Sequence, residues 1–98
     1  MLIVFSGLPG TGKTTIANAL AAATGAVYLR IDSIEQAIRS SGALAQDVGC
    51  SGYRVANELA LSNLRLGLTV IVDCVNPVIE SRMAWSETAS KAGVRLLN

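Results

Sequence analysis

Glycines and a lysine–threonine pair near the start of the chain have the types and spacing to bind phosphate. Gly7, Gly12, Lys13 and Thr14 match the pattern G-x-x-x-x-G-K-[ST] at each of its defined positions. Backbone amides in such a loop can surround an anion, Lys13 supplies a positive charge for the outer phosphates, and the Thr14 hydroxyl can ligate Mg²⁺. The motif predicts that the phosphates of a nucleotide are held by Gly7, Leu8, Pro9, Gly10, Thr11, Gly12, Lys13, Thr14 and Thr15.

The segments on either side of this motif support the interpretation. Residues 2–5 form an apolar run typical of a buried strand, and a helical pattern runs from Lys13 to about Thr24. A strand, a glycine loop and a helix in that order are the context in which the motif binds phosphate, and the helix start adds free N–H groups and a positive dipole end. The alternative is a plain glycine-rich turn, which the flanking elements disfavour.

Two carboxylates follow predicted strands and are candidates for metal binding and proton transfer. Asp73 ends the β-prone run 69–73, where an acidic group can hold Mg²⁺ directly or through water. Asp32 follows a strand expected over 27–31. The chain has no histidine, so a carboxylate must accept the proton of an attacking hydroxyl, and Asp32 is the candidate general base. The structural alternatives are a helix cap for Asp32 and a cap or loop residue for Asp73.

Arginines are candidates for binding an anionic substrate, because charge on a transferring phosphoryl group spreads over its oxygens. The sequence offers Arg39, Arg54 and Arg82 on predicted helices. Each of them also suits a solvated helix face.

Short apolar runs alternate with helical segments along the chain. Strands are expected over 2–5, 27–31, 69–73 and 94–97, and helices over 13–24, 33–41, 53–66 and 77–92. Asp32 or Ser33 is expected to cap the second helix, and Asn76 the fourth, with Pro77 at its first position. Residues 42–52 carry three glycines without a clean period and are expected to form a loop. In the third helix, the spacing predicts one buried face made of Val55, Ala56, Leu59 and Ala60.

This order of elements predicts an α/β fold with a mostly parallel sheet between two layers of helices. Together with the phosphate motif it predicts the three-layer α/β/α P-loop NTPase fold. Such sheets bind ligands at the carboxyl ends of their strands, and the phosphate loop, Asp32 and Asp73 all follow strand ends. A chain of 98 residues suits a single domain, residues 1–98. The fourth strand stops abruptly, so we expect the fold to be truncated there and the chain to be the N-terminal part of a longer protein.

Composition narrows the partners and the compartment. The net charge of +1 disfavours a strongly basic surface for nucleic acid. Cys50 and Cys74 form no C-x-x-C pair, so neither a zinc site nor a disulfide framework is indicated, and Cys74 is expected to be a packing residue. No apolar run approaches the roughly 20 residues that cross a bilayer, and the apolar start lacks the basic leader of a signal peptide. We expect a soluble, cytoplasmic protein without membrane partners.

The motif over residues 7–15 resembles the phosphate loop of small P-loop kinases, a family that includes gluconate kinases, adenylylsulfate kinases, chloramphenicol phosphotransferase, polynucleotide kinases and zeta toxins. The resemblance continues in Leu29-Arg30-Ile31-Asp32, in residues 67–73, and in Asn76 and Arg82. It implies an ATP-dependent kinase that phosphorylates a hydroxyl of a small molecule. It also implies catalytic roles for Lys13, Asp32 and Arg82, with Mg²⁺ held by Thr14 and Asp73.

The sequence also departs from this family. Members often carry an arginine three residues after the strand-two aspartate, where this chain has Glu35. The arginine-bearing lid and the adenine-contacting loop of the family would lie beyond Asn98. Two other functions therefore stay open, a nucleotide-dependent ATPase or switch domain and a non-catalytic nucleotide-binding fragment. The acceptor is also open among sugar acids, nucleosides, antibiotics, polynucleotide ends and sugar nucleotides.

Overall fold

The computed structural model describes residues 1–7, 12–42, 51–74 and 79–97 of the chain. In these ranges, β1 (Leu2–Ser6), β2 (Val27–Arg30), β3 (Val70–Cys74) and β4 (Leu96–Leu97) form one sheet in the order β2-β3-β1-β4. All three strand pairings are parallel. The helices are α1 (Lys13–Thr24), α2 (Ile31–Ser41), α3 (Ser51–Arg65) and α4 (Ile79–Ala92). The predicted α/β fold with a parallel sheet is confirmed.

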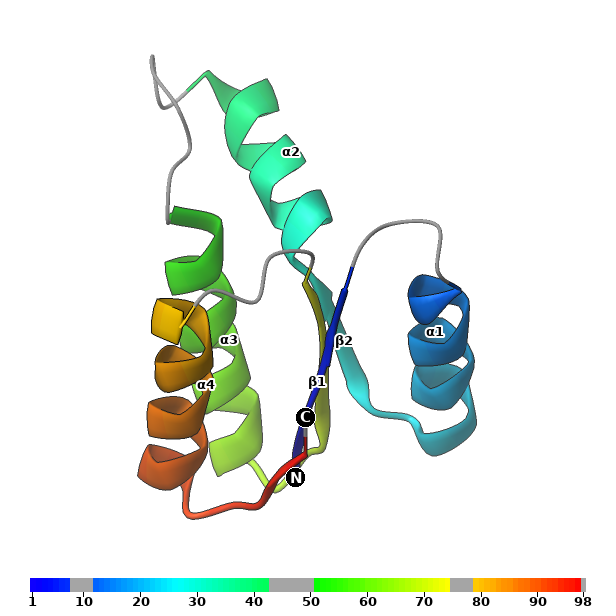
Figure 1. Cartoon of the computed structure of the whole chain (residues 1–98), viewed down its shortest axis with the longest axis vertical. Helices are drawn as coiled ribbons and strands as arrows, with labels where there is room; N and C mark the ends of the chain where they lie inside the picture. Colours follow the sequence, from blue (N-terminus) through cyan, green and yellow to red (C-terminus); the bar gives the residue numbers. More distant parts are fainter. Residues whose placement is uncertain (8–11, 43–50, 75–78, 98) are drawn as a thin grey trace.

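Helices cover both faces of the sheet, as Figure 1 shows, with α1 on one side and α3 and α4 on the other. The alternation of strand side chains produces a core on each face. Ile71 packs with Ala17 and Ala21 of α1. Its neighbours along β3, Val70 and Val72, belong to the larger core under α3 and α4. The alternation also places Asp73 on the same face as Ile71, and therefore on the side of α1.

The start of α2 differs from the prediction. β2 ends at Arg30 and the helix begins at Ile31, with Arg30 as its N-cap residue and no side-chain capping hydrogen bond. The expected cap by Asp32 or Ser33 is therefore wrong, and Asp32 lies in the first turn of the helix. The reason is burial, because the Ile31 side chain is only 2% exposed and the chain turns at this residue to insert it into the core.

Other element boundaries shift by one to two residues. β3 begins at Val70 and includes Cys74, which is buried as a packing residue. β4 is shorter than the predicted strand over 94–97, and α3 starts at Ser51, inside the predicted loop. The expected helix start at Asn76 and Pro77 lies outside the described residues.

The buried face of α3 consists of residues at a spacing of four, three of them small. Gly52, Ala56, Ala60 and Leu64 are buried, whereas Val55 and Leu59, expected on the same face, are 41% and 43% exposed. Small side chains at three of these positions let the helix backbone pack closely, and the larger Val55 and Leu59 are turned outwards. The sequence prediction was right for the two alanines and wrong for Val55 and Leu59.

The close approach of α2 to α3 depends on Gly52. A Cβ atom added there would lie 2.6 Å from the Cγ atom of Glu35. We expect Gly52→Ala to destabilise the wild-type chain by about 1 kcal/mol through this clash. In a Glu35→Ala background the same change should stabilise it by about 0.5 kcal/mol, because alanine favours helix over glycine. Urea unfolding of the four chains measures the coupling, and equal effects in both backgrounds would contradict it.

None of the helices within the described ranges is both long enough and apolar enough to cross a membrane. The cytoplasmic location stays a prediction.

Candidate phosphate and metal site

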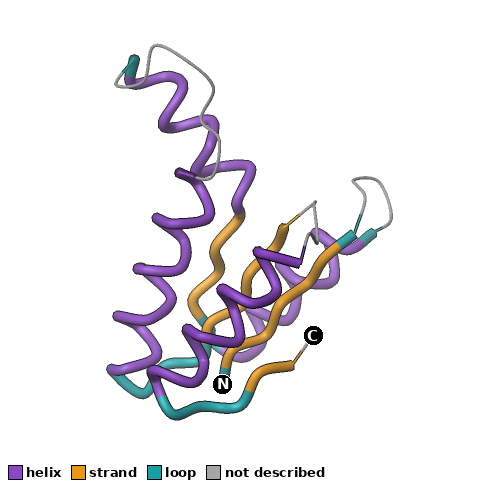
Figure 2. Tube along the Cα trace, turned by 60° about the vertical axis from the view of Figure 1, so that its left-hand side comes forward, coloured by secondary structure: helices purple, strands orange, loops and turns teal. Residues whose placement is uncertain are grey.

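The candidate site lies at the carboxyl ends of β1, β2 and β3, the end of the sheet away from the N-terminus (Figures 1 and 2). β1 leads into Gly7, and α1 begins at Lys13. The parallel register sets Phe5 of β1 and Arg30 of β2 on either side of Asp73. Residues far apart in the sequence are therefore brought to one edge.

Two glycines in the described part of the predicted phosphate loop have positive φ angles. Gly7 and Gly12 have φ angles of 145° and 82°, which side chains disfavour. Gly12 is the N-cap residue of α1, so Lys13, Thr14 and Thr15 form the first turn of this helix. Thr15 is exposed. Leu8, Pro9, Gly10 and Thr11 lie outside the described residues.

Lys13 and Asp73 form a buried ion pair. The Nζ atom of Lys13 donates to Oδ1 of Asp73, and it lies 3.2 Å from the carbonyl oxygen of Cys74, to which it also donates. The side chains are 9% and 4% exposed. Because buried charges are costly unless they are paired and hydrogen-bonded, this geometry holds the lysine at the end of β3.

Two hydroxyl groups also contact the Asp73 carboxylate. Thr14 Oγ1 donates to Asp73 Oδ2 at 2.8 Å, and the Tyr28 hydroxyl donates to the same oxygen at 2.9 Å. Thr14 comes from α1 and Tyr28 from β2. The carboxylate is thus oriented from two separate elements.

These contacts shift the pKa values of the Asp73 carboxyl and the Tyr28 hydroxyl. Burial alone would raise the pKa of Asp73, but hydrogen bonds from Lys13, Thr14 and Tyr28, together with the Lys13 charge, lower it below its usual 3.8. Burial and the neighbouring carboxylate raise the pKa of Tyr28 to about 12. At neutral pH, Asp73 is therefore ionised and Tyr28 remains a donor.

Asp73 should make stability depend on pH in acid. A carboxyl whose pKa is lowered by folding stabilises the fold above its unfolded value of 3.8, and this stabilisation is lost as the pH falls through the folded-state pKa. We expect Asp73→Asn to lower the free energy of unfolding at pH 7 by about 2 kcal/mol. The difference from wild type should close as the pH falls below 3.8. Urea unfolding followed by fluorescence of Trp85, the single tryptophan, measures both.

Asp32→Asn is the matched control, because it removes an exposed carboxylate from the same end of the sheet. It should change the free energy of unfolding by less than about 0.5 kcal/mol. A difference between Asp73→Asn and wild type that stayed constant with pH would contradict the assignment.

The oxygens at this point suit Mg²⁺. Thr14 Oγ1 and Asp73 Oδ2 are hard ligands 2.8 Å apart. Within the described residues, no group of three or more His, Cys, Asp or Glu side chains gathers around a point. Mg²⁺ is commonly bound through one or two protein oxygens, with water and substrate phosphates completing its shell. The pair therefore fits a magnesium site that a nucleotide helps to complete.

Asp32 lies at the edge of the site and is linked to it through Arg30. The Asp32 side chain is 59% exposed, and its Oδ2 atom lies 4.0 Å from Nη2 of Arg30. The Nε atom of Arg30 lies 4.0 Å from Oδ2 of Asp73. The candidate base therefore faces solvent, where an acceptor can approach.

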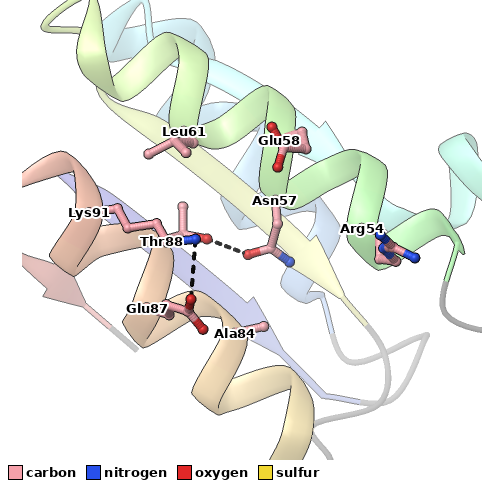
Figure 3. A pocket seen from close by; sticks show the side chains of 8 residues that line it. All are labelled: Arg54, Asn57, Glu58, Leu61, Ala84, Glu87, Thr88 and Lys91. Atoms are coloured by element: carbon pink, nitrogen blue, oxygen red, sulfur yellow. Dashed lines mark hydrogen bonds and ion pairs between the residues drawn. The ribbon is translucent and has the colours of Figure 1, made fainter.

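The predicted arginines have different surroundings. Arg39 lies in the last turn of α2, and Arg82 is exposed on α4. Arg54 lines a groove between α3 and α4, shown in Figure 3, where the Thr88 hydroxyl donates to Oδ1 of Asn57 at 2.6 Å. Across the described ranges, none of the three forms an ion pair with Asp32 or Asp73. Their substrate-binding role stays a prediction.

Sequence reasoning missed Tyr28 and Arg30. Tyr28 packs against the core cluster under α1, and its hydroxyl also contacts Asp73. Tyr28 and Arg30 are two positions apart on β2, so their side chains share a face of the sheet. Arg30 is also in register with Asp73. The sequence signal that could have identified these two residues is their spacing of two along the strand that leads to Asp32.

Comparisons with known proteins agree with this fold. A family model described as an AAA domain matches residues 2–97. A candidate kinase from Chloroflexus aurantiacus has a TM-score of 0.84 at 22% identity, over 97% of this chain and 54% of its own. A sugar kinase from Janibacter has a TM-score of 0.68 at 25% identity, over 88% of this chain and 53% of its own.

A gluconokinase from Sinorhizobium meliloti has a TM-score of 0.65 at 23% identity, over 97% of this chain and 54% of its own. A search of curated proteins finds no significant match. The chain spans about half the length of these three structures, and the fold they share confirms the resemblance to small P-loop kinases. Because the family model matches nearly every residue, the chain belongs to this AAA domain family.

Proposed function

We propose that this chain carries the nucleotide and metal site of a kinase that transfers the γ-phosphoryl group of ATP to a hydroxyl of a small molecule. The observation that supports this best is the meeting of Lys13, Thr14 and Asp73 at the end of the sheet where Asp32 lies in the first turn of α2. The sugar kinase and gluconokinase among similar structures support the same reaction class. The chain spans about half their length, so the proposed activity belongs to the whole protein.

In this proposal each residue has a separate task. Lys13 and the backbone amides of residues 7–15 hold the β- and γ-phosphates. Thr14 and Asp73 hold Mg²⁺, which neutralises charge on the phosphates when it is bound. Asp32 accepts the proton of the acceptor hydroxyl, and Arg82 binds negative charge on the substrate. Rate enhancement then comes from positioning and charge stabilisation, without a covalent enzyme intermediate.

The test is nucleotide consumption by the chain with Mg-ATP, with and without hydroxyl acceptors. The first acceptors are a sugar and a sugar acid, chosen from the names of the similar structures. ADP formation that depends on an acceptor supports the proposal. Hydrolysis without an acceptor would favour a switch or ATPase, and binding without turnover would favour a non-catalytic fragment. Absence of any nucleotide binding by folded chain would overturn the proposal.

A further inference from the structure

Arg30 is placed between the two functional carboxylates by β2. It is the last residue of this strand and pairs in register with Asp73. Its side chain shares the strand face of Tyr28, whose hydroxyl also contacts Asp73. The guanidinium therefore spans from the buried Asp73 to the exposed Asp32.

The guanidinium of Arg30 is only loosely held. Both of its ion pairs, to Asp32 and to Asp73, measure 4.0 Å, beyond hydrogen-bond length. The side chain is 41% exposed. A counter-ion with a purely structural role would be expected to lie closer to one carboxylate. Here the donors of a planar group that suits phosphate oxygens are shared between two carboxylates and face solvent.

The neighbouring cation, Lys13, is held by closer contacts than Arg30. Lys13 donates to Asp73 and to the carbonyl oxygen of Cys74, and it is 9% exposed. Within the described ranges, Arg30 is the arginine that forms ion pairs with both Asp32 and Asp73. Its position lies between the carboxylate assigned to the metal and the carboxylate assigned to the acceptor.

We propose that Arg30 binds the γ-phosphate of the nucleotide and carries its charge during transfer, an inference that rests on the proposed kinase function. In the reaction, the acceptor oxygen forms a bond to the γ-phosphorus while the bond from that phosphorus to the β–γ bridging oxygen breaks. ADP keeps the electron pair of the broken bond, and the hydroxyl proton passes to Asp32. Arg30 stays in contact with the negatively charged oxygens of the phosphoryl group while this group passes from ADP to the acceptor oxygen.

The test compares the binding of a non-hydrolysable ATP analogue (AMP-PNP) and of ADP, each with Mg²⁺, by titration calorimetry of the 98-residue chain. We expect Arg30→Gln to weaken binding of the analogue about tenfold and to change ADP binding less than about twofold, because ADP lacks the γ-phosphate. Arg30→Lys keeps the charge but loses the planar fork, so it should weaken analogue binding about threefold. The control is Arg65→Gln, in the last turn of α3, which should bind both nucleotides as wild type does.

The outcomes separate this inference from the function on which it rests. A loss confined to the analogue supports Arg30 as the γ-phosphate ligand. An equal loss for both nucleotides, or no loss for either, would overturn it while leaving the nucleotide site intact. If wild type binds neither nucleotide, the proposed function fails first. Trp85 fluorescence shows whether each variant is folded.

Discussion

Replacing Lys13 with alanine is expected to weaken Mg-ATP binding about a hundredfold, because the variant loses two charge-assisted contacts to the outer phosphates. Without nucleotide, the same ammonium group pairs with Asp73. Nucleotide binding must therefore move Lys13 from Asp73 to the phosphates. The loss of the ion pair with Asp73 offsets part of the free energy gained from the phosphate contacts. Calorimetric titration of wild type and variant with Mg-ATP measures the change.

The chain contains a second lysine that serves as a control. Lys91 lies on α4 and pairs with Glu87 at 3.1 Å on the exposed surface. Lys91→Ala removes the same charge from the molecule but not from the candidate site, so its affinity for Mg-ATP should match wild type. If Lys13→Ala and Lys91→Ala bound Mg-ATP equally well, the phosphate site would be assigned to the wrong residues.

Replacing Asp32 with asparagine is expected to slow phosphoryl transfer at least about a hundredfold, the usual contribution of a positioned base. Mg-ATP affinity should stay within about threefold of wild type, because Asp32 is exposed and does not contact Lys13, Thr14 or Asp73. The measurement is formation of phosphorylated acceptor by the protein that carries this domain, beside calorimetric binding of Mg-ATP.

The matched control for Asp32→Asn is the loss of a carboxylate that lies away from the candidate site. Glu87→Gln removes an exposed acid from α4 and should leave both transfer and binding unchanged. Turnover by Asp32→Asn at the wild-type rate would end the assignment of Asp32 as base. A fall in Mg-ATP affinity as large as the fall in rate would instead assign Asp32 to nucleotide binding.

The sequence was sufficient for the fold and for part of the site. A complete phosphate motif between an apolar strand and a helix determines where Lys13 and Thr14 lie, because the loop is short and both flanking elements are regular. The rule that parallel strands present their carboxyl ends together then brings Asp73 to them. The sequence therefore predicts that these residues lie at the same end of the sheet, and the structure adds the direct contacts from Lys13 and Thr14 to Asp73.

What the sequence could not provide is register and helix rotation. The pairing of Arg30 with Asp73 depends on how β2 slides along β3, and no local pattern specifies that distance. The exposure of Val55 depends on how α3 rotates over the sheet. Apolar size alone predicts it to be buried, but backbone proximity selected the small residues Ala56 and Ala60. The end of β2 was misplaced because burial of Ile31 overrode the capping preference of its neighbours.

The pairing of β1 also has a consequence for synthesis of the chain. Leu2 lies in register with Val70 on one side and with Leu96 on the other. A ribosome adds roughly 5–20 residues each second, so β1 emerges several seconds before either of the strands that pair with it. During that delay the apolar residues of β1 have α1 as their nearest completed element. Until residue 70 has emerged, β1 should therefore be a site at which chaperones capture the nascent chain.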